Sequence, residues 1–345
     1  MVSYHYIENV SRAINGNSVT WSIRWNNARM LVDLGPSPTG NTIQDSFIEK
    51  YHAAVDDGDD EEEEMISDQI SDFIVETGRA LFDQFAPPPA PDASTPGDLH
   101  SLIFPKGYIF YFHTDEETNV PEVLFVCDED VITSMEFDMG LEIKFDLKYR
   151  LLAHPDLVLP KFSTRDIYIQ QKLLDDGYIA RVSAGGRQMC CKVGNESRAA
   201  ALQRELSSRM TISTSQHAAA LRVPKLLGLI EVAEDGRIIG LLQEYVPFSA
   251  ERWTLGDIDL VSSISKGRRE KWASQIQETV KLLHQIGVTW GDAKAGNVLI
   301  HRDTDDAWII DFGGGWTDGW VSQELSGTVE GDWVGVKRIL EFLGV

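Results

Sequence analysis

The stretches 290-WGDAKAGN-297 and 307-AWIIDFGGG-315 decide the fold of the second half of this chain. The first leads into a short apolar run and the second contains one, and both runs have the length of a strand. We predict that they form a hairpin whose turn is 303-DTDD-306, because Asp and Thr side chains favour turns. That hairpin would bring Asn297 and Asp311 to the same end of the strand pair.

Polar residues in these two stretches fit the chemistry of phosphoryl transfer. Asp292, Lys294 and Asn297 follow one another at steps of two and three, and Asp311 lies nineteen residues after Asp292. An amide oxygen and a carboxylate are hard ligands, suited to a Mg²⁺ ion that bridges phosphates. Asp292, on the loop before the hairpin, is free to accept a hydroxyl proton. Either stretch alone is usually a turn or a cap, but together they indicate a phosphoryl-transfer site.

These stretches resemble the catalytic loop and the metal-binding loop of the protein-kinase-like superfamily, with a resemblance that covers roughly residues 165–345. Fungal kinase-like proteins with a Gly-Asp-x-Lys-x-x-Asn loop and an Asp-Phe-Gly-Gly-Gly run share the pattern. The resemblance implies that Asp292 is the catalytic aspartate and that Lys294 steadies the transferring phosphoryl group. It also implies that Asn297 and Asp311 bind the metal, and that the cofactors are ATP and Mg²⁺.

The same family pattern calls for a strand lysine that contacts the α- and β-phosphates and a helix glutamate that pairs with it. Lys192 ends the apolar run 189–191 and has the right place in the order. Glu205 lies thirteen residues later on a predicted helix, while Glu196 precedes that helix and is the weaker candidate. A surface Lys–Glu pair is the alternative.

The segment 242-LQEYVP-247 resembles the kinase hinge, which holds adenine by main-chain hydrogen bonds. On this resemblance Gln243 is the gatekeeper, the residue at the back of the adenine pocket. The carbonyl of Glu244 would accept a hydrogen bond from the adenine amino group, and the amide of Val246 would donate one to the ring.

Three departures from the family pattern bear on activity and control. The glycine-rich loop should have three glycines, yet 173-LLDDGYIARV-182 keeps only Gly177, and its two aspartates would repel phosphates. Trp290 and Gly291 replace the usual His-Arg pair, which argues against control by a phosphorylated activation loop. Asp332 resembles the aspartate that opens the large helix of the second lobe, and only 13 residues follow it, which predicts a reduced lobe.

Hydrophobic periodicity in the second half predicts a small sheet lobe followed by a helical lobe. The expected order is two strands within 167–182, a strand at 188–193, a helix at 197–210, strands at 227–232 and 238–246, and a helix that includes 272–283.

The first half reads as a mixed α/β region whose chemistry the sequence does not name. A hairpin is expected to begin with the alternating strand 19–25, an amphipathic helix to span 66–85, and strands to lie at 108–112, 123–126 and 141–149. The acidic run 56-DDGDDEEEE-64 predicts a mobile, solvated loop, and the Pro-rich segment 86–98 an extended linker or surface loop.

Composition limits the partners and the setting. The 31 Lys and Arg residues against 54 Asp and Glu residues give a formal net charge of -23, which disfavours binding to nucleic acid or to an anionic membrane. The first residues do not form a signal peptide, and no stretch has the length of a membrane span. Cys190 and Cys191 are neighbours that cannot form an unstrained disulfide, so a reduced, cytoplasmic protein is expected.

We therefore predict an α+β chain with a mixed region at 1–155 and a two-lobed kinase-like domain at 156–345, divided near residue 246 into an N-lobe and a reduced C-lobe. The expected function is ATP- and Mg²⁺-dependent transfer of a γ-phosphate to a hydroxyl of a protein or a small molecule. Two alternatives stay open. One is a kinase-like binding module without catalysis, and the other is a scaffold that phosphorylates a hydroxyl to activate it for cyclisation or elimination.

Overall fold

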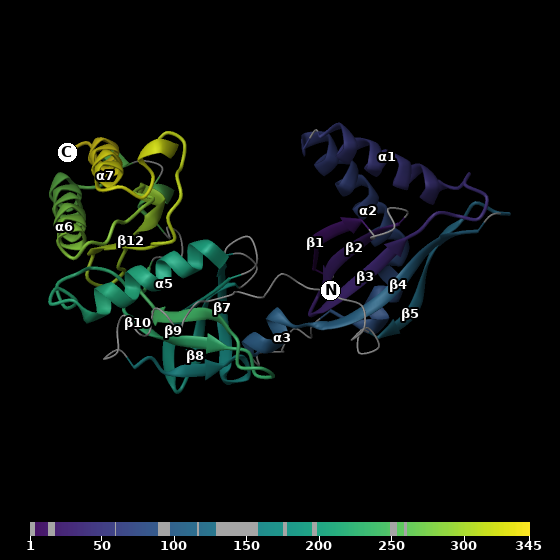
Figure 1. Ribbon diagram of the computed structural model, residues 1–345, viewed down its shortest axis with the longest axis horizontal. Coiled ribbons are helices and arrows are strands. Elements are labelled where there is room, and N and C mark those ends of the chain that lie inside the picture. The colour runs from purple at the N-terminus through teal and green to yellow at the C-terminus, as the bar shows by residue number, and fades with distance from the viewer. Residues whose placement is uncertain are drawn as a thin grey trace. The chain divides into compact units, whose positions relative to one another are not determined.

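The computed structural model of the chain divides into two compact units, which we describe separately. The first unit comprises the described residues up to 88 together with 101–128, drawn in purple to blue in Figure 1. The second comprises 97–100 and 158–345, and the division falls within the short helix α3 (Leu99–Ile103). The structure describes residues 4–12, 18–58, 60–88, 97–115, 117–128, 158–174, 178–194, 199–248, 254–258 and 261–345.

The first unit is a sheet with two helices inserted between its third and fourth strands. Its strands pair in chain order and are antiparallel, apart from the parallel pair β3–β4. A parallel connection needs a crossover, and the two helices supply it. The elements are β1 (His5–Arg12), β2 (Val19–Trp25), β3 (Ala28–Leu34), α1 (Ile43–Asp57), α2 (Asp60–Phe85), β4 (Lys106–Thr114) and β5 (Pro121–Asp128).

Alternation along β2 sets the core of this unit, as the sequence predicts. Trp21 and Trp25 are fully buried on one face of the strand, and Asn26 turns the chain into β3 with a φ of 52°. The ring of Phe82 on α2 lies edge-on to Trp25 with centroids 5.4 Å apart, and 5.0 Å from the ring of Phe110 on β4. The predicted helix and the hairpin therefore share one aromatic core.

The prediction of a loop over the acidic run 56–64 is wrong for its described residues. Helix α1 continues to Asp57, Gly58 caps it in the left-handed conformation with a φ of 70°, and α2 begins at Asp60. The described carboxylates are largely exposed, and those in the first turn of α2 interact favourably with the positive end of its helix dipole. Helix α2 therefore begins before its first apolar residues, with an acidic first turn.

Several expectations for the first half lie outside the described residues. These are the strand at 141–149, residues 89–96 of the Pro-rich segment, and the boundary near residue 155, which falls within 129–157. The end of α2 at Phe85, just before the prolines, is as predicted. The boundary between the regions stays a prediction.

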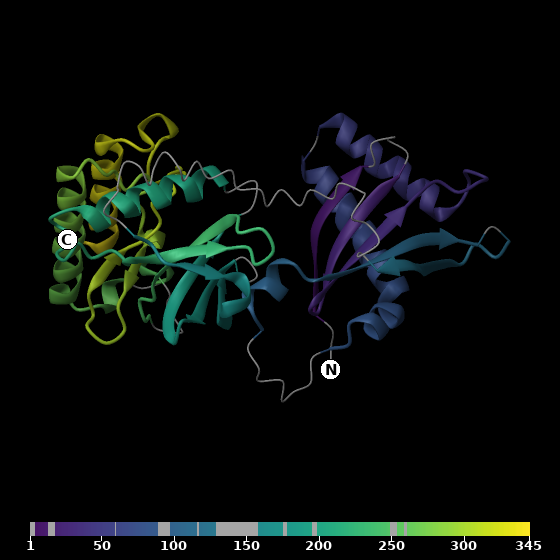
Figure 2. The same cartoon turned by 60° about the horizontal axis from the view of Figure 1, so that its bottom comes forward.

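The second unit has a sheet lobe built from six strands in the order β6-β10-β11-β9-β8-β7. All pairs are antiparallel except β6–β10, and the helix α5 connects β9 to β10. Figure 2 shows α5, in teal, lying beside the strands of this sheet. The elements are β6 (Lys161–Ser163), β7 (Ile167–Leu174), β8 (Ile179–Ala184), β9 (Arg187–Val193), α5 (Ala199–Thr214), β10 (Leu226–Glu231) and β11 (Ile238–Glu244).

The other lobe of this unit is helical and carries the predicted hairpin. It consists of α6 (Lys266–Gln285), β12 (Val298–Ile300), β13 (Ala307–Ile309) and α7 (Val329–Leu343). Val298 pairs with Ile309, and the amide of Ile310 donates to the carbonyl of Asn297 at 3.0 Å. The hairpin therefore holds Asn297 and Asp311 at the same end, as the sequence predicts.

The first testable expectation concerns the aromatic core of the first unit. Phe82→Ala should lower the free energy of unfolding of this unit by about 3–5 kcal/mol, because the ring is fully buried between Trp25 and Phe110. Chemical denaturation followed by tryptophan fluorescence measures the loss. Leu124→Ala is the control, since its side chain on β5 is 42% exposed, and a loss below about 1 kcal/mol for Phe82→Ala would contradict this packing.

Candidate active site

A cavity of about 160 Å³ within the second unit is lined by residues of both lobes. Its apolar walls include Ile179, Val246 and Leu299, and its polar end collects most of the residues singled out from the sequence. Lys192, Glu205, Asn297 and Asp311 all line it, as do the hinge residues Gln243 and Glu244.

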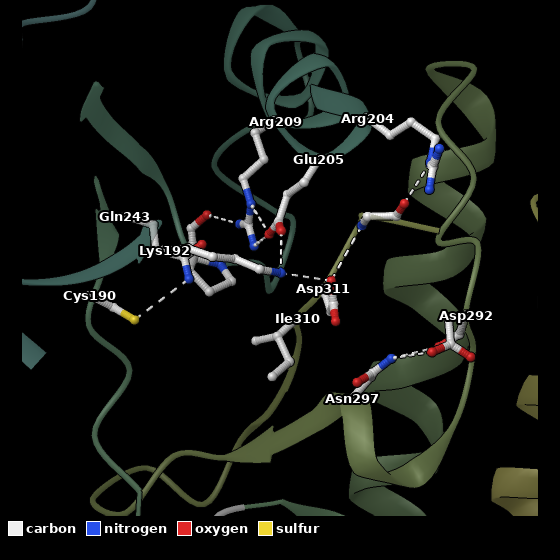
Figure 3. A network of polar contacts seen from close by, with 12 residues as sticks. Cys190, Lys192, Arg204, Glu205, Arg209, Gln243, Asp292, Asn297, Ile310 and Asp311 are labelled. Carbon is white, nitrogen blue, oxygen red and sulfur yellow. Dashed lines mark hydrogen bonds and ion pairs between the residues drawn. The ribbon is translucent and has the colours of Figure 1, made fainter. Parts of the chain in front are cut away.

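Lys192 joins the sheet, the helix α5 and the metal-binding loop at this polar end. Its Nζ lies 2.5 Å from Oε2 of Glu205 and 2.8 Å from Oδ1 of Asp311 (Figure 3). Of the two candidate glutamates, Glu205 is therefore the partner, and Glu196 lies outside the described residues. The Glu205 side chain is only 1% exposed, whereas Asp311 is 44% exposed and faces the cavity.

Arg209 is a second cation on the buried carboxylate of Glu205, and the sequence analysis did not identify it. Its Nε and Nη2 donate to Oε1 of Glu205 at 3.1 and 2.9 Å, and Nη1 donates to the carbonyl of Pro224 at 2.5 Å. The guanidinium also lies 5.1 Å from the ring centre of Phe312. A signal was present, because residues four apart on a helix face each other.

The charges at this polar end favour the ionised forms of Lys192 and Asp311. Burial would by itself lower the pKa of Lys192, but the carboxylates of Glu205 and Asp311 raise it above its usual value. For Asp311, burial works to raise the pKa, yet the Lys192 charge and the hydrogen bonds from Lys192 and the Gly313 amide bring it below its usual value.

The loop from Asp311 to Gly313, predicted to bind metal, is fixed by its own backbone and by α5. Asp311 has a φ of 62°, a left-handed conformation that Asp tolerates better than most residues. The Gly313 amide lies 3.3 Å from Oδ1 of Asp311. The Gly313 carbonyl accepts a hydrogen bond of 2.6 Å from Nε of Arg204. A Cβ at Gly313 would come within 3.2 Å of Ala201, so a side chain there would push α5 away.

The carboxylate of Asp292 is buried and held by three side chains. Lys294 Nζ lies 2.7 Å from Oδ2, and the hydroxyl of Thr317 donates to Oδ1 at 3.1 Å. The amide nitrogen of Asn297 donates to the main-chain carbonyl of Asp292 at 2.9 Å, and lies 3.3 Å from Oδ2. Sequence reasoning missed Thr317, because it lies outside the family motifs that carried the resemblance.

Asp332 fixes the backbone of the loop that carries Asp292. Its carboxylate accepts hydrogen bonds from the amides of Trp290 and Gly291 at 2.7 and 2.8 Å and contacts Nε2 of His284 at 2.7 Å. It is 2% exposed and lies in the first turn of α7. The aspartate that the sequence placed at the opening of this helix thus anchors the loop.

Residues 176–318 match the family model described as protein kinase domain. This match supports membership of that part of the chain in the protein-kinase-like superfamily. A protein kinase domain points in general to phosphotransfer and to a nucleotide as the partner. No curated protein matches the chain.

Glu244 and Val246, the predicted hinge residues, both line the cavity. Glu244 ends β11 and is fixed by a hydrogen bond from its amide to the carbonyl of Lys225 at 2.8 Å. Val246 follows it along the cavity wall. Gly177 and the two aspartates before it lie outside the described residues. Among the helices that are described, none is long and apolar enough to cross a membrane.

The second testable expectation concerns Glu205. Glu205→Gln should destabilise the kinase domain by about 3 kcal/mol or more, because it leaves the buried Arg209 and the largely buried Lys192 without their shared counter-charge. Denaturant unfolding compared with the wild type measures the loss. Glu278→Gln is the matched control, since its ion pair with Arg222 is exposed and should change stability by no more than about 0.5 kcal/mol. Equal effects in the two variants would contradict the role given to Glu205.

Proposed function

We propose that the chain is an ATP- and Mg²⁺-dependent phosphotransferase that moves the γ-phosphate to a hydroxyl of a protein or small-molecule acceptor. The observation that carries the proposal is that Lys192, Asn297 and Asp311 line one cavity, with Glu205 holding the lysine and Asp292 in contact with Asn297. We also propose a reducing, cytoplasmic setting, which the three free cysteines support.

The donor set fits a magnesium ion carried by a nucleotide. The amide nitrogen of Asn297 is engaged with Asp292, which leaves its oxygen as the ligand atom, and the carboxylate of Asp311 lines the same cavity. Mg²⁺ is usually held by one or two such oxygens together with substrate phosphates, and it would neutralise phosphate charge. Within the described residues there is no group of three or more His, Cys, Asp or Glu side chains placed to hold a metal by themselves.

Lys192 is placed to bind phosphate. Its side chain is 20% exposed and lines the cavity, and its ammonium is held by Glu205, so it could contact phosphate oxygens without losing its buried partner. The ammonium lies 2.8 Å from Oδ1 of Asp311, the carboxylate that we propose as a metal ligand. We assign Lys192 to the α- and β-phosphates, as the family pattern implies.

Asp292 is the proposed acceptor of the hydroxyl proton. Its carboxylate is oriented by Thr317 and Lys294, so that an acceptor hydroxyl would meet a fixed base rather than a freely rotating side chain. Lys294 also donates to the Thr317 hydroxyl at 2.8 Å, which ties base and cation into one network. In the proposed role, the Lys294 charge would steady the transferring phosphoryl group.

The competing function is nucleotide binding without catalysis, and its support is the single glycine in 173–182. A module that only binds nucleotide does not need a proton acceptor. The network around Asp292 therefore favours the enzyme, and the next experiment separates the two.

The third testable expectation distinguishes the two aspartates. Asp311→Asn should weaken metal-dependent ATP binding and reduce turnover, because Asp311 is the proposed metal ligand. Asp292→Asn should keep ATP–Mg²⁺ affinity near the wild type while kcat falls by about 10²-fold or more, because Asp292 would contact the acceptor and not the nucleotide. Calorimetric titration, paired with steady-state rates against a panel of protein and metabolite acceptors, measures both.

Two outcomes would decide against the assignment of the base. One is that Asp292→Asn binds ATP–Mg²⁺ as poorly as Asp311→Asn, and the other is that it turns over at the wild-type rate. Asp303→Asn is a suitable control, since this aspartate lies on the exposed turn of the same hairpin, where its carboxylate pairs with the neighbouring Arg302. It should leave both quantities unchanged.

A further inference from the structure

A second cavity lies in the sheet lobe, lined by the C-terminal half of α5 and by residues 218–227. Its volume is about 340 Å³, about twice that of the candidate active-site cavity and within the usual range of small-molecule sites. Its walls are mainly apolar, with Ile212, Val223 and Leu226 among them. The cavity therefore suits the apolar body of a small ligand.

The charged side chains that line this cavity are cations. Of the described residues that line it, only Arg209 and Lys225 carry a charge, although the chain as a whole has a formal net charge of -23. Arg209 is paired with Glu205, whereas Lys225 is exposed and its ammonium forms no ion pair among the described residues. An apolar cavity with one uncompensated cation favours a ligand that combines an apolar body with one anionic group.

The wall of this cavity is joined to the residues that hold the catalytic-site lysine. Pro224 lines both cavities, and its carbonyl accepts a hydrogen bond of 2.5 Å from Nη1 of Arg209. Arg209 also donates to Glu205, which holds Lys192 (Figure 3). A ligand in the second cavity would therefore act on a segment that positions the Lys192 contact.

The same wall is joined to the predicted hinge. The amide of Glu244 donates to the carbonyl of Lys225 at 2.8 Å, and the Glu244 carboxylate accepts a hydrogen bond of 3.4 Å from the Lys225 amide. Since Lys225 directly follows Pro224, this one segment contacts two parts of the candidate active site.

We infer that the second cavity is an effector site for a small apolar carboxylate, whose binding strengthens nucleotide binding at the candidate active site. The apolar body would lie against the cavity walls, and the carboxylate would pair with Lys225. A ligand that fills the cavity stabilises the arrangement in which Arg209 holds Glu205 beside Lys192, and a preformed phosphate site binds nucleotide more tightly. The inference rests on the proposed function of the site that it regulates.

The fourth testable expectation concerns octanoate as the probe and octan-1-ol as its uncharged counterpart. Calorimetry on the full chain should show octanoate binding more tightly than octan-1-ol by about 3-fold, the value of one exposed charge pair. Lys225→Met should remove this difference. Lys281→Met is the matched control, because Lys281 is exposed on α6 and does not line the cavity, and it should keep the difference.

A blocked cavity supplies the second arm of the test. Ala219 is exposed and lines the cavity, so Ala219→Trp should fill its mouth and lower octanoate affinity by about 10-fold or more. Ala220→Trp is the matched control, since its neighbour Ala220 is equally exposed but is not part of the lining, and it should bind octanoate like the wild type.

The coupling is measured as the affinity for ATP–Mg²⁺ with and without saturating octanoate. Octanoate should tighten ATP–Mg²⁺ binding by about 5-fold in the wild type and in Ala220→Trp, but not in Ala219→Trp. Equal octanoate affinity in the two tryptophan variants would overturn the site, and so would octan-1-ol binding as tightly as octanoate to the wild type. Unchanged or weaker ATP–Mg²⁺ binding would overturn the effector role.

These outcomes are distinct from failure of the proposed function. ATP–Mg²⁺ binding that octanoate strengthens, without turnover against any acceptor, would refute phosphotransfer and leave the effector site intact. Octanoate binding without any nucleotide binding would refute both the proposed function and the coupling, and would leave only the carboxylate site.

Discussion

The site depends on the buried carboxylate of Glu205, which is shared by Lys192 and Arg209. A carboxylate that is 1% exposed is costly to desolvate, and two cations with good geometry offset that cost. Because Lys192 comes from β9 and Glu205 from α5, their contact holds the helix against the sheet. Lys192 also contacts Asp311, which ties the loop after β13 to the sheet lobe. One charge network thus positions the groups that we propose for phosphate binding and metal binding.

A second buried carboxylate, that of Asp332, positions a loop in the helical lobe. The Asp332 carboxylate accepts hydrogen bonds from the amides of Trp290 and Gly291. The loop before Asp292 is therefore held through its backbone rather than through its side chains. Close packing supports this arrangement, because a Cβ at Gly335 on α7 would lie 2.3 Å from the carbonyl of Ala293. The catalytic loop can therefore carry an unusual Trp-Gly pair and keep its shape. Both lobes use buried carboxylates to satisfy polar groups that would otherwise be costly.

Much of the site could be predicted because its residues lie in short, ordered motifs. Asn297 and Asp311 are brought together by a local hairpin, and the pairing of Lys192 with Glu205 follows from their order along the chain. Thr317 and the pair of Cys190 with Gln243 were missed because their contacts join segments far apart in sequence. Arg209 was missed although it lies four residues after Glu205 on the same helix, a spacing that the sequence shows. The acidic run was predicted to be a loop because of its density of like charges. Acidic side chains are favourable in the first turn of a helix, and α2 begins within this run.

The central claim is that Lys192, Asn297 and Asp311 form one metal–nucleotide site. Its most direct test is a crystal structure with a non-hydrolysable ATP analogue and Mn²⁺, in which anomalous scattering locates the metal. The account predicts a metal peak in contact with the Asp311 carboxylate and the Asn297 amide oxygen, with Nζ of Lys192 on the nucleotide phosphates. A nucleotide bound outside this cavity, or a metal held without Asp311 and Asn297, would contradict it.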